Sequence, residues 1–261
     1  MSLDDMLFQI ALAEGRYTDP LGLSRHAAQV YSQNGEDGMI AEIFSRIGTR
    51  DKFFVEFGIE DGTENNTRLL LESGWNGVWL DANKEATARA ADTFHSFIAS
   101  GALKIVNHPV TKDNVNILLE SNDVPRTFDF LSLDIDQNTH HVWQSLQFTA
   151  RACCVEYNAA IPPVLELGAP YDPEKFWDGT NWFGAGLGAL ENIGRRKDLD
   201  LVGCDLLGIN AFFVGANETS GKFREPFTAV THWEPLRHGL VGRRGHPAAK
   251  AARLWSATSA A

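Results

Sequence analysis

The sequence has few cysteines, and their scarcity limits the kind of protein that it encodes. Only three occur in 261 residues. Cys153 and Cys154 are adjacent within an apolar run, and Cys204 lies far from them. An odd number of cysteines without Cys-x-x-Cys spacing argues against a disulfide framework and against a structural zinc site. We therefore expect a reducing compartment, and a cytoplasmic location, for this chain.

Long apolar runs are also missing. No stretch approaches the roughly 18 consecutive apolar residues that a membrane-spanning helix needs. The segment from Met1 to Glu14 contains two aspartates and lacks the basic and long apolar regions of a secretory signal. We expect neither a signal peptide nor a membrane partner.

The chain lacks an excess of positive charge. Its formal net charge is −11 and its pI is about 5.1, whereas affinity for nucleic acids comes largely from Lys and Arg that neutralise phosphates. We therefore expect no nucleic-acid partner. From Lys222 onward, however, seven Lys or Arg residues accompany only two acidic ones. This basic C-terminal end is either a solvated surface or a face for an anionic acceptor. The sequence does not determine the oligomeric state, and a homo-oligomer is possible.

Internal repeats and low-complexity linkers are absent, and strand-like and helix-like segments alternate along the chain. This alternation predicts βαβ units around a parallel sheet. A short turn at 207–210 joins the last two predicted strands, which predicts a terminal hairpin. We therefore predict a doubly wound, Rossmann-like α/β sheet, mostly parallel with a C-terminal antiparallel hairpin, as in class I methyltransferases. The predicted strands are 53–57, 77–80, 103–106, 128–135, 152–157, 200–204 and 211–214, and the predicted helices are 38–47, 63–72, 85–100, 140–146 and 185–194.

The most informative segment spans Phe53 to Thr67, FFVEFGIEDGTENNT. Its strand ends at Glu56, and Gly58 allows a tight turn and a close approach of a ligand to the backbone. With Glu60 and Asp61 the turn carries three carboxylates, which would repel a pyrophosphate but suit a ligand with an ammonium and a sulfonium group. Alternatively, Glu60 and Asp61 only stabilise the first turn of the next helix.

Two further residues complete the expected cofactor site. Asn65 belongs to the same turn and is also a candidate helix cap. Asp81 ends the second predicted strand, 25 residues after Glu56. An acidic residue at this position accepts hydrogen bonds from ribose hydroxyls. The Gly-x-Gly-x-x-Gly pattern of dinucleotide-binding turns is absent, which argues against an NAD-dependent oxidoreductase.

Polar side chains also follow the fourth and fifth predicted strands. Asp134 and Asp136 lie on one face of the fourth strand because strand side chains alternate, and Glu156 and Asn158 end the fifth. The four side chains offer three alternatives: a divalent cation site with oxygen ligands, a general base whose pKa is raised by crowding, or ordinary strand-end polarity. We assign no metal, and we expect Asp134 and Asp136 to be catalytic.

Two adjacent histidines, His140 and His141, follow at the start of the next predicted helix. Neighbouring positions on a helix diverge by about 100°, so at most one of them faces the site. Either is a further candidate for the catalytic base.

In six segments the chain resembles the FkbM-like branch of class I S-adenosylmethionine-dependent methyltransferases, over roughly residues 30 to 215. In the resemblance Glu56 and Gly58 match the cofactor loop, Asp81 matches the ribose-binding acid, and Asp134 and Asp136 match the fourth-strand motif. Two features depart from the family: Ile135-Asp136-Gln137 stands where members read Val-Glu-Gly, and the cofactor loop has fewer glycines. The matching segments are YSQNGEDG (31–38), FVEFGIEDGTENNT (54–67), LSLDID (131–136), VEYN (155–158), WDGTNWFGA (177–185) and GINAFFV (208–214).

The resemblance implies S-adenosylmethionine as cofactor and methylation of a hydroxyl on a sugar or small natural product, so that the partner is a small-molecule or glycan acceptor. The alternatives are a methyltransferase-like binding domain without turnover and the NAD-dependent oxidoreductase. We expect an N-terminal helical extension over 1–30, a methyltransferase domain over 31–220 and a basic C-terminal extension over 221–261.

Overall fold

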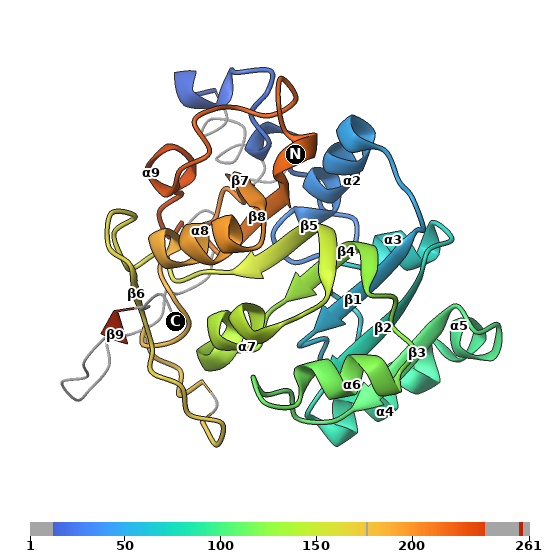
Figure 1. The fold of residues 1–261 in the computed structure, drawn as a ribbon. Coiled ribbons are helices and arrows are strands. Elements are labelled where there is room, and N and C mark those ends of the chain that lie inside the picture. The colour runs from blue at the N-terminus through green and yellow to red at the C-terminus, as the bar shows by residue number, and fades with distance from the viewer. Residues whose placement is uncertain (1–12, 176, 238–255, 258–261) are drawn as a thin grey trace.

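A seven-stranded sheet forms the centre of the computed structural model, which describes residues 13–175, 177–237 and 256–257 (Figure 1). The strand order is β3-β2-β1-β4-β5-β8-β7. β1 to β5 are parallel, and β8 is antiparallel to both of its neighbours, β5 and β7. The predicted Rossmann-like sheet with a C-terminal antiparallel hairpin is therefore confirmed. The strands are β1 Phe53–Phe57, β2 Asn76–Asp81, β3 Leu103–Asn107, β4 Thr127–Leu133, β5 Thr149–Glu156, β7 Leu199–Cys204 and β8 Asn210–Gly215.

Helices cover both faces of the sheet, because strand side chains alternate between two hydrophobic cores. Val55 and Leu131 belong to the core that α6, α7 and α8 cover, whereas Phe54 and Phe130 belong to the core beneath α2, α3 and α4. The helices are α2 Glu36–Ile47, α3 Arg68–Glu72, α4 Lys84–Thr93, α5 His95–Ala99, α6 Val115–Ser121, α7 Thr139–Ser145, α8 Leu187–Arg196 and α9 Ala229–His232. Every described helix is too short or too polar to span a bilayer.

Two predicted helices differ from the structure, and one helix of the structure was not predicted. The helix predicted for 63–72 begins only at Arg68. The helix predicted for 85–100 is broken at Phe94, whose buried ring packs edge-on against Trp79 with 4.8 Å between centroids. The sequence analysis did not predict α6, which connects β3 to β4.

The chain segments on either side of the predicted central domain pack against each other. Between residues 13 and 30 the described helices are short 3-10 turns, Gly15–Tyr17 and Ser24–His26. Tyr17 donates a hydrogen bond to Glu234, and Arg16 forms an ion pair with the same carboxylate at 2.9 Å. Residues 1–12 of the predicted helical extension lie outside the described residues.

Most of the predicted basic C-terminal extension, 238–255 and 258–261, also lies outside the described residues. Its described Lys and Arg residues are Lys222, Arg224 and Arg237, and the two arginines bind other groups of the protein. Arg224 donates to the carbonyl oxygen of Arg16, and Arg237 forms an ion pair with Glu234. A short two-stranded sheet pairs β6, Leu167–Gly168, with β9, Ser256–Ala257.

Candidate active site

A cavity of about 840 Å³ opens at the carboxyl ends of β1, β2, β4 and β5. The strand order reverses between β1 and β4, since β1 leads outward to β2 and β3 while β4 leads to β5. In open α/β sheets, ligands bind outside the carboxyl ends of the strands at such a reversal. The cavity therefore occupies the ligand-binding position of this fold.

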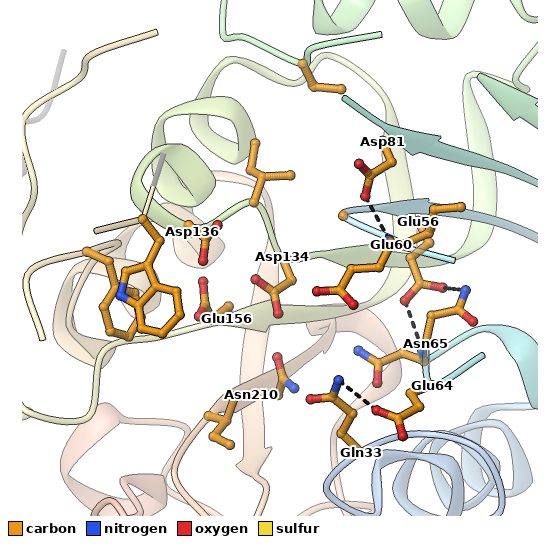
Figure 2. A pocket seen from close by; sticks show the side chains of 18 of the residues that line it. Gln33, Glu56, Glu60, Glu64, Asn65, Asp81, Asp134, Asp136, Glu156 and Asn210 are labelled. Carbon is orange, nitrogen blue, oxygen red and sulfur yellow. Dashed lines mark hydrogen bonds between the residues drawn. The ribbon is translucent and has the colours of Figure 1, made fainter. Parts of the chain in front are cut away.

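The cavity walls are strongly acidic (Figure 2). Of the described residues that line it, only Lys175 is basic. A cleft lined by charges of one sign concentrates ligands of the opposite sign, so the cavity favours a ligand with positive charge. The lining carboxylates belong to Glu36, Glu56, Glu60, Asp61, Glu64, Asp81, Asp134, Asp136 and Glu156.

Glu56 organises the turn that follows β1. Its side chain is only 3% exposed, and its carboxylate accepts hydrogen bonds from the backbone N–H groups of Asn66 and Thr67 at 2.8 and 3.0 Å. The Asn65 amide and the Thr67 hydroxyl donate to it as well. Burial nevertheless raises the pKa of Glu56. These bonds hold residues 65–67 in a loop, which explains why α3 begins at Arg68 rather than at Thr63.

Gly58 is required where the loop after β1 meets the loop after β4. Its φ is +80°, and a Cβ at this position would lie 1.6 Å from the carbonyl oxygen of Asp134. Glu60, with φ +50°, donates its backbone N–H to Asp81 at 2.8 Å. The carboxylate of Asp61 accepts a hydrogen bond from the Thr63 hydroxyl, which lowers its pKa. Asp61 is thus bonded to its own loop, although it also lines the cavity.

Asp81 lies at the predicted position, at the end of β2. One carboxylate oxygen accepts from the N–H of Glu60 and the other from the N–H of Asn83 at 2.7 Å. Asn83 in turn caps α4 by accepting from Glu85 and Ala86. Asp81 therefore fixes the loops after β1 and β2 relative to each other at the cavity wall (Figure 2).

Three acidic side chains meet at the ends of β4 and β5. Asp134, Asp136 and Glu156, here called the carboxylate cluster, place one oxygen each within 4.8 Å of one another (Figure 2). Burial, followed by the charge of Asp136, raises the pKa of Asp134 to about 7. Burial and Asp134 raise the pKa of Glu156 well above its ordinary value. Asp136 has its pKa raised by burial and by Glu60. Cation binding or proton uptake at this cluster would relieve the repulsion.

Asn158 does not join this cluster. Its amide nitrogen donates to the carbonyl oxygens of Asn181 and Phe183 at 2.8 and 2.9 Å, and its oxygen accepts from the N–H of Ala160. Both ends of the side chain are therefore used to hold the loop that carries Phe183. We predicted Asn158 beside the aspartates, and that grouping is wrong because the chain turns at the end of β5.

Asn210 lies beside the cluster instead, and the sequence analysis missed it. It begins β8 and pairs with Glu156 across the β5–β8 ladder, so the two side chains share one face of the sheet. Asn210 is 4% exposed and donates to Glu36 at 2.8 Å. The predicted hairpin at 207–210 indicated that Asn210 lies next to a strand. The sequence did not indicate which residue it faces, because the register of an antiparallel pair cannot be read from either strand alone.

The two candidate histidines lie on α7, and neither lines the cavity. His140 is buried against Gly168, and burial, followed by the neighbouring His141, lowers its pKa to about 3. His141 contacts the Ala169 carbonyl oxygen at 2.9 Å and the ring of Tyr171. The structure therefore brings both histidines toward the 168–171 segment and not toward Asp134 or Asp136.

Aromatic side chains form part of the cavity wall. Tyr157, Trp177 and Phe183 are among the residues that line the cavity. Trp177 is 41% exposed at its rim and donates its indole N–H to the carbonyl oxygen of Thr180 at 2.7 Å. The cavity thus combines an acidic floor with an apolar wall, as sites for small organic ligands commonly do.

No family model and no curated protein sequence matches the chain. Solved structures of similar fold include an S-adenosylmethionine-dependent methyltransferase from Clostridium acetobutylicum, with 11% identity, 70% of this chain and 92% of that chain covered, and a TM-score of 0.44. An O-methyltransferase from Bacillus cereus in complex with SAH has 14% identity, coverages of 82% and 89%, and a TM-score of 0.45. Magnesium protoporphyrin IX methyltransferase from Synechocystis has 10% identity, coverages of 82% and 96%, and a TM-score of 0.42. At such low identity these likenesses concern the fold alone.

Proposed function

We propose that this protein is an S-adenosylmethionine-dependent methyltransferase. The observation that carries the proposal is an acidic cavity at the strand-order reversal, with Asp81 at its wall and no basic side chain in the described loop after β1. A pyrophosphate would need the reverse, namely exposed backbone N–H groups and positive charge. A cofactor that combines a ribose, an ammonium group and a sulfonium suits this site.

In the proposed complex the loops after β1 and β2 hold the cofactor. Asp81 accepts hydrogen bonds from the ribose hydroxyls, for which its carboxylate oxygens retain lone pairs beside their two backbone bonds. Gly58 allows the cofactor to approach the backbone. The Asn65 side-chain oxygen is buried without a hydrogen-bond partner among the described residues, so it is available to the ammonium group. Glu56 supports this arrangement by holding Asn65.

The acceptor lies beside the carboxylate cluster, against the aromatic wall. Methyl transfer needs a nucleophilic oxygen in line with the sulfonium, so positioning supplies much of the acceleration. Asp134 and Asp136 activate the acceptor hydroxyl by promoting loss of its proton. The acceptor class that fits is a hydroxylated sugar or small natural product, and the reaction requires neither nucleic acid nor a membrane.

Calorimetry on the full chain tests the cofactor assignment. S-adenosylmethionine and S-adenosylhomocysteine should bind, whereas NAD should not. Asp81→Ala should weaken binding by about 1.5–3 kcal/mol, because a charged hydrogen-bond partner is lost. Asp92→Ala is the control, since Asp92 is an exposed acid on α4 outside the cavity. Binding of NAD alone would overturn the proposal in favour of an oxidoreductase, and unchanged affinity in Asp81→Ala would remove Asp81 from the site.

Turnover is tested separately from binding. Release of S-adenosylhomocysteine in the presence of hydroxylated sugars and phenols would support a methyltransferase. Binding of the cofactor without release for any acceptor in the panel would favour the alternative of a binding domain without turnover.

A further inference from the structure

We propose that the carboxylate cluster, together with the side-chain oxygen of Asn210, binds a divalent cation such as Mg²⁺ or Mn²⁺. The binding itself is independent of the cofactor assignment. Its role in catalysis, by contrast, rests on the proposed methyltransferase function.

The first observation is the geometry of the oxygen atoms. One carboxylate oxygen from each of Asp134, Asp136 and Glu156 lies within 4.8 Å of the other two. The backbone fixes this convergence. Asp134 directly follows β4, and Glu156 ends the neighbouring strand β5. Asp136 takes a left-handed conformation with φ +57°. Hard divalent cations prefer carboxylate and carboxamide oxygens, which is the set that these strands assemble.

The second observation is that two buried oxygens at this place lack partners. Oε2 of Glu156 and Oδ1 of Asn210 are buried without a hydrogen-bond partner among the described residues. Asn210 is 96% buried, since its exposed fraction is 4%, and Figure 2 shows its carboxamide beside the cluster. Buried polar atoms are almost always satisfied by protein groups, water or ions. Two buried oxygens on neighbouring strands, without hydrogen-bond partners in the described part of the chain, therefore indicate a binding position for a positively charged group.

The third observation is the charge balance. Three carboxylates lie together, and among the described residues no Lys or Arg forms an ion pair with any of them. A shared proton would neutralise one carboxylate and leave two charges facing each other. An ammonium group carries a single charge. A divalent cation offsets two charges and accepts oxygen ligands from all four side chains, which makes it the best match for the cluster.

Such a cation would give Asp134 and Asp136 a defined role. Mg²⁺ usually retains several coordination positions for water or substrate oxygens. An acceptor hydroxyl at one of these positions would have a lowered pKa and would lose its proton more readily. The aspartates would then activate the acceptor through the ion that they hold.

The test uses the full chain, treated with EDTA and dialysed, without cofactor or acceptor. Mn²⁺ binding is measured by electron paramagnetic resonance and calorimetry, with Mg²⁺ as competitor. We expect a single saturable site that Mg²⁺ displaces. Glu156→Gln and Asp136→Asn should each weaken Mn²⁺ binding by at least about tenfold, with circular dichroism confirming the fold of each variant.

Glu64→Gln is the matched control, because it removes one charge from the same cavity but lies outside the cluster. It should change Mn²⁺ affinity by less than about twofold, since only a screened long-range interaction is lost. Absence of Mn²⁺ binding to the wild type would overturn the proposal, as would equal binding by Glu156→Gln. A protein that binds S-adenosylhomocysteine but no Mn²⁺ refutes the cation site alone. One that binds Mn²⁺ but no S-adenosylhomocysteine refutes the proposed cofactor alone.

Discussion

The neighbouring strands β4 and β5 carry facing polar side chains at both of their ends, and the two ends differ in charge. Near the amino end, Asp129 of β4 faces Arg151 of β5 at 2.6 Å. Five residues further along each strand, Asp134 stands beside Glu156 at the cavity. One end pairs opposite charges, and the other end collects like charges. The same two strands thus serve two purposes.

At the amino end Asp129, Arg151 and Glu218 form ion pairs with one another. The buried Asp129 carboxylate accepts backbone N–H groups of Arg50 and Lys52 at 2.8 and 2.9 Å, and Arg151 also binds Glu218 at 2.6 Å. Burial alone would raise the pKa of Asp129, but the Arg151 hydrogen bond and the backbone N–H groups lower it overall. A buried charge with a complete set of partners holds the sheet to its connecting loops.

At the carboxyl end burial, followed by the neighbouring carboxylates, raises the pKa values of Asp134 and Glu156 instead. An uncompensated buried charge costs stability, so this arrangement is not explained by folding. Perturbed carboxylates in a cleft are typical of functional sites. The comparison indicates that the charged side chains at the amino ends of β4 and β5 stabilise the fold. It favours a ligand-binding role for those at the carboxyl ends.

The largest expected effect is on turnover. Asp134→Asn should lower kcat by about 10²–10⁴-fold, because it neutralises the group that we propose to promote loss of the acceptor proton. The measurement is release of S-adenosylhomocysteine at saturating acceptor, with cofactor binding checked by calorimetry. Full kcat in both Asp134→Asn and Asp136→Asn would show that the carboxyl end has no catalytic role.

The next effect is on stability at the opposite end. Asp129→Asn should lower the free energy of unfolding by about 3–5 kcal/mol, because it leaves Arg151 with one fewer buried partner. Urea unfolding followed by circular dichroism measures this change. Affinity for S-adenosylhomocysteine should stay unchanged in the same variant. A loss of ligand affinity without a loss of stability would reverse the roles of the two ends.

A smaller effect of opposite sign is expected at the cluster. Glu156→Gln, measured in EDTA, should raise the free energy of unfolding by about 1 kcal/mol, because one repelling carboxylate is removed. The same urea titration compares it directly with Asp129→Asn. Strong destabilisation by Glu156→Gln would mean that the cluster is a structural pair like the one at the amino end.

The smallest effect is a pH dependence at the amino end. Since folding lowers the pKa of Asp129, its stabilising contribution is present above the ordinary pKa of 3.8 and is lost as the pH falls through the folded value. The stability difference between wild type and Asp129→Asn should therefore shrink below pH 3.8. A difference that grows on acidification would contradict the lowered pKa.

The sequence predicted most of what parallel strands determine. Glu56, Asp81, Asp134 and Asp136 end predicted strands, and all four line one cavity because the carboxyl ends of parallel strands meet at one edge. The sequence could not predict which of these carboxylates accept hydrogen bonds from the protein itself. The carboxylate of Glu56 accepts hydrogen bonds from backbone N–H groups of the loop that follows it. These bonds depend on the three-dimensional path of the loop.

Side chains outside the parallel strands were less predictable. The orientation of His140 and His141 depends on the rotation of α7 about its axis, and the 168–171 segment that receives them is distant in sequence. Asn210 reaches the cluster only through the antiparallel register of β8 against β5. Such long-range pairings are set by packing and not by local pattern.

Hydrogen–deuterium exchange of the full chain with and without saturating S-adenosylhomocysteine tests the central claim most directly, because it reports both binding and its location. The account predicts increased protection in peptides that cover 58–62 and 80–84, at the carboxyl end of the sheet. It predicts unchanged exchange around Asp129 and Arg151. Protection confined to the amino end, or no protection anywhere at ligand concentrations in the millimolar range, would contradict it.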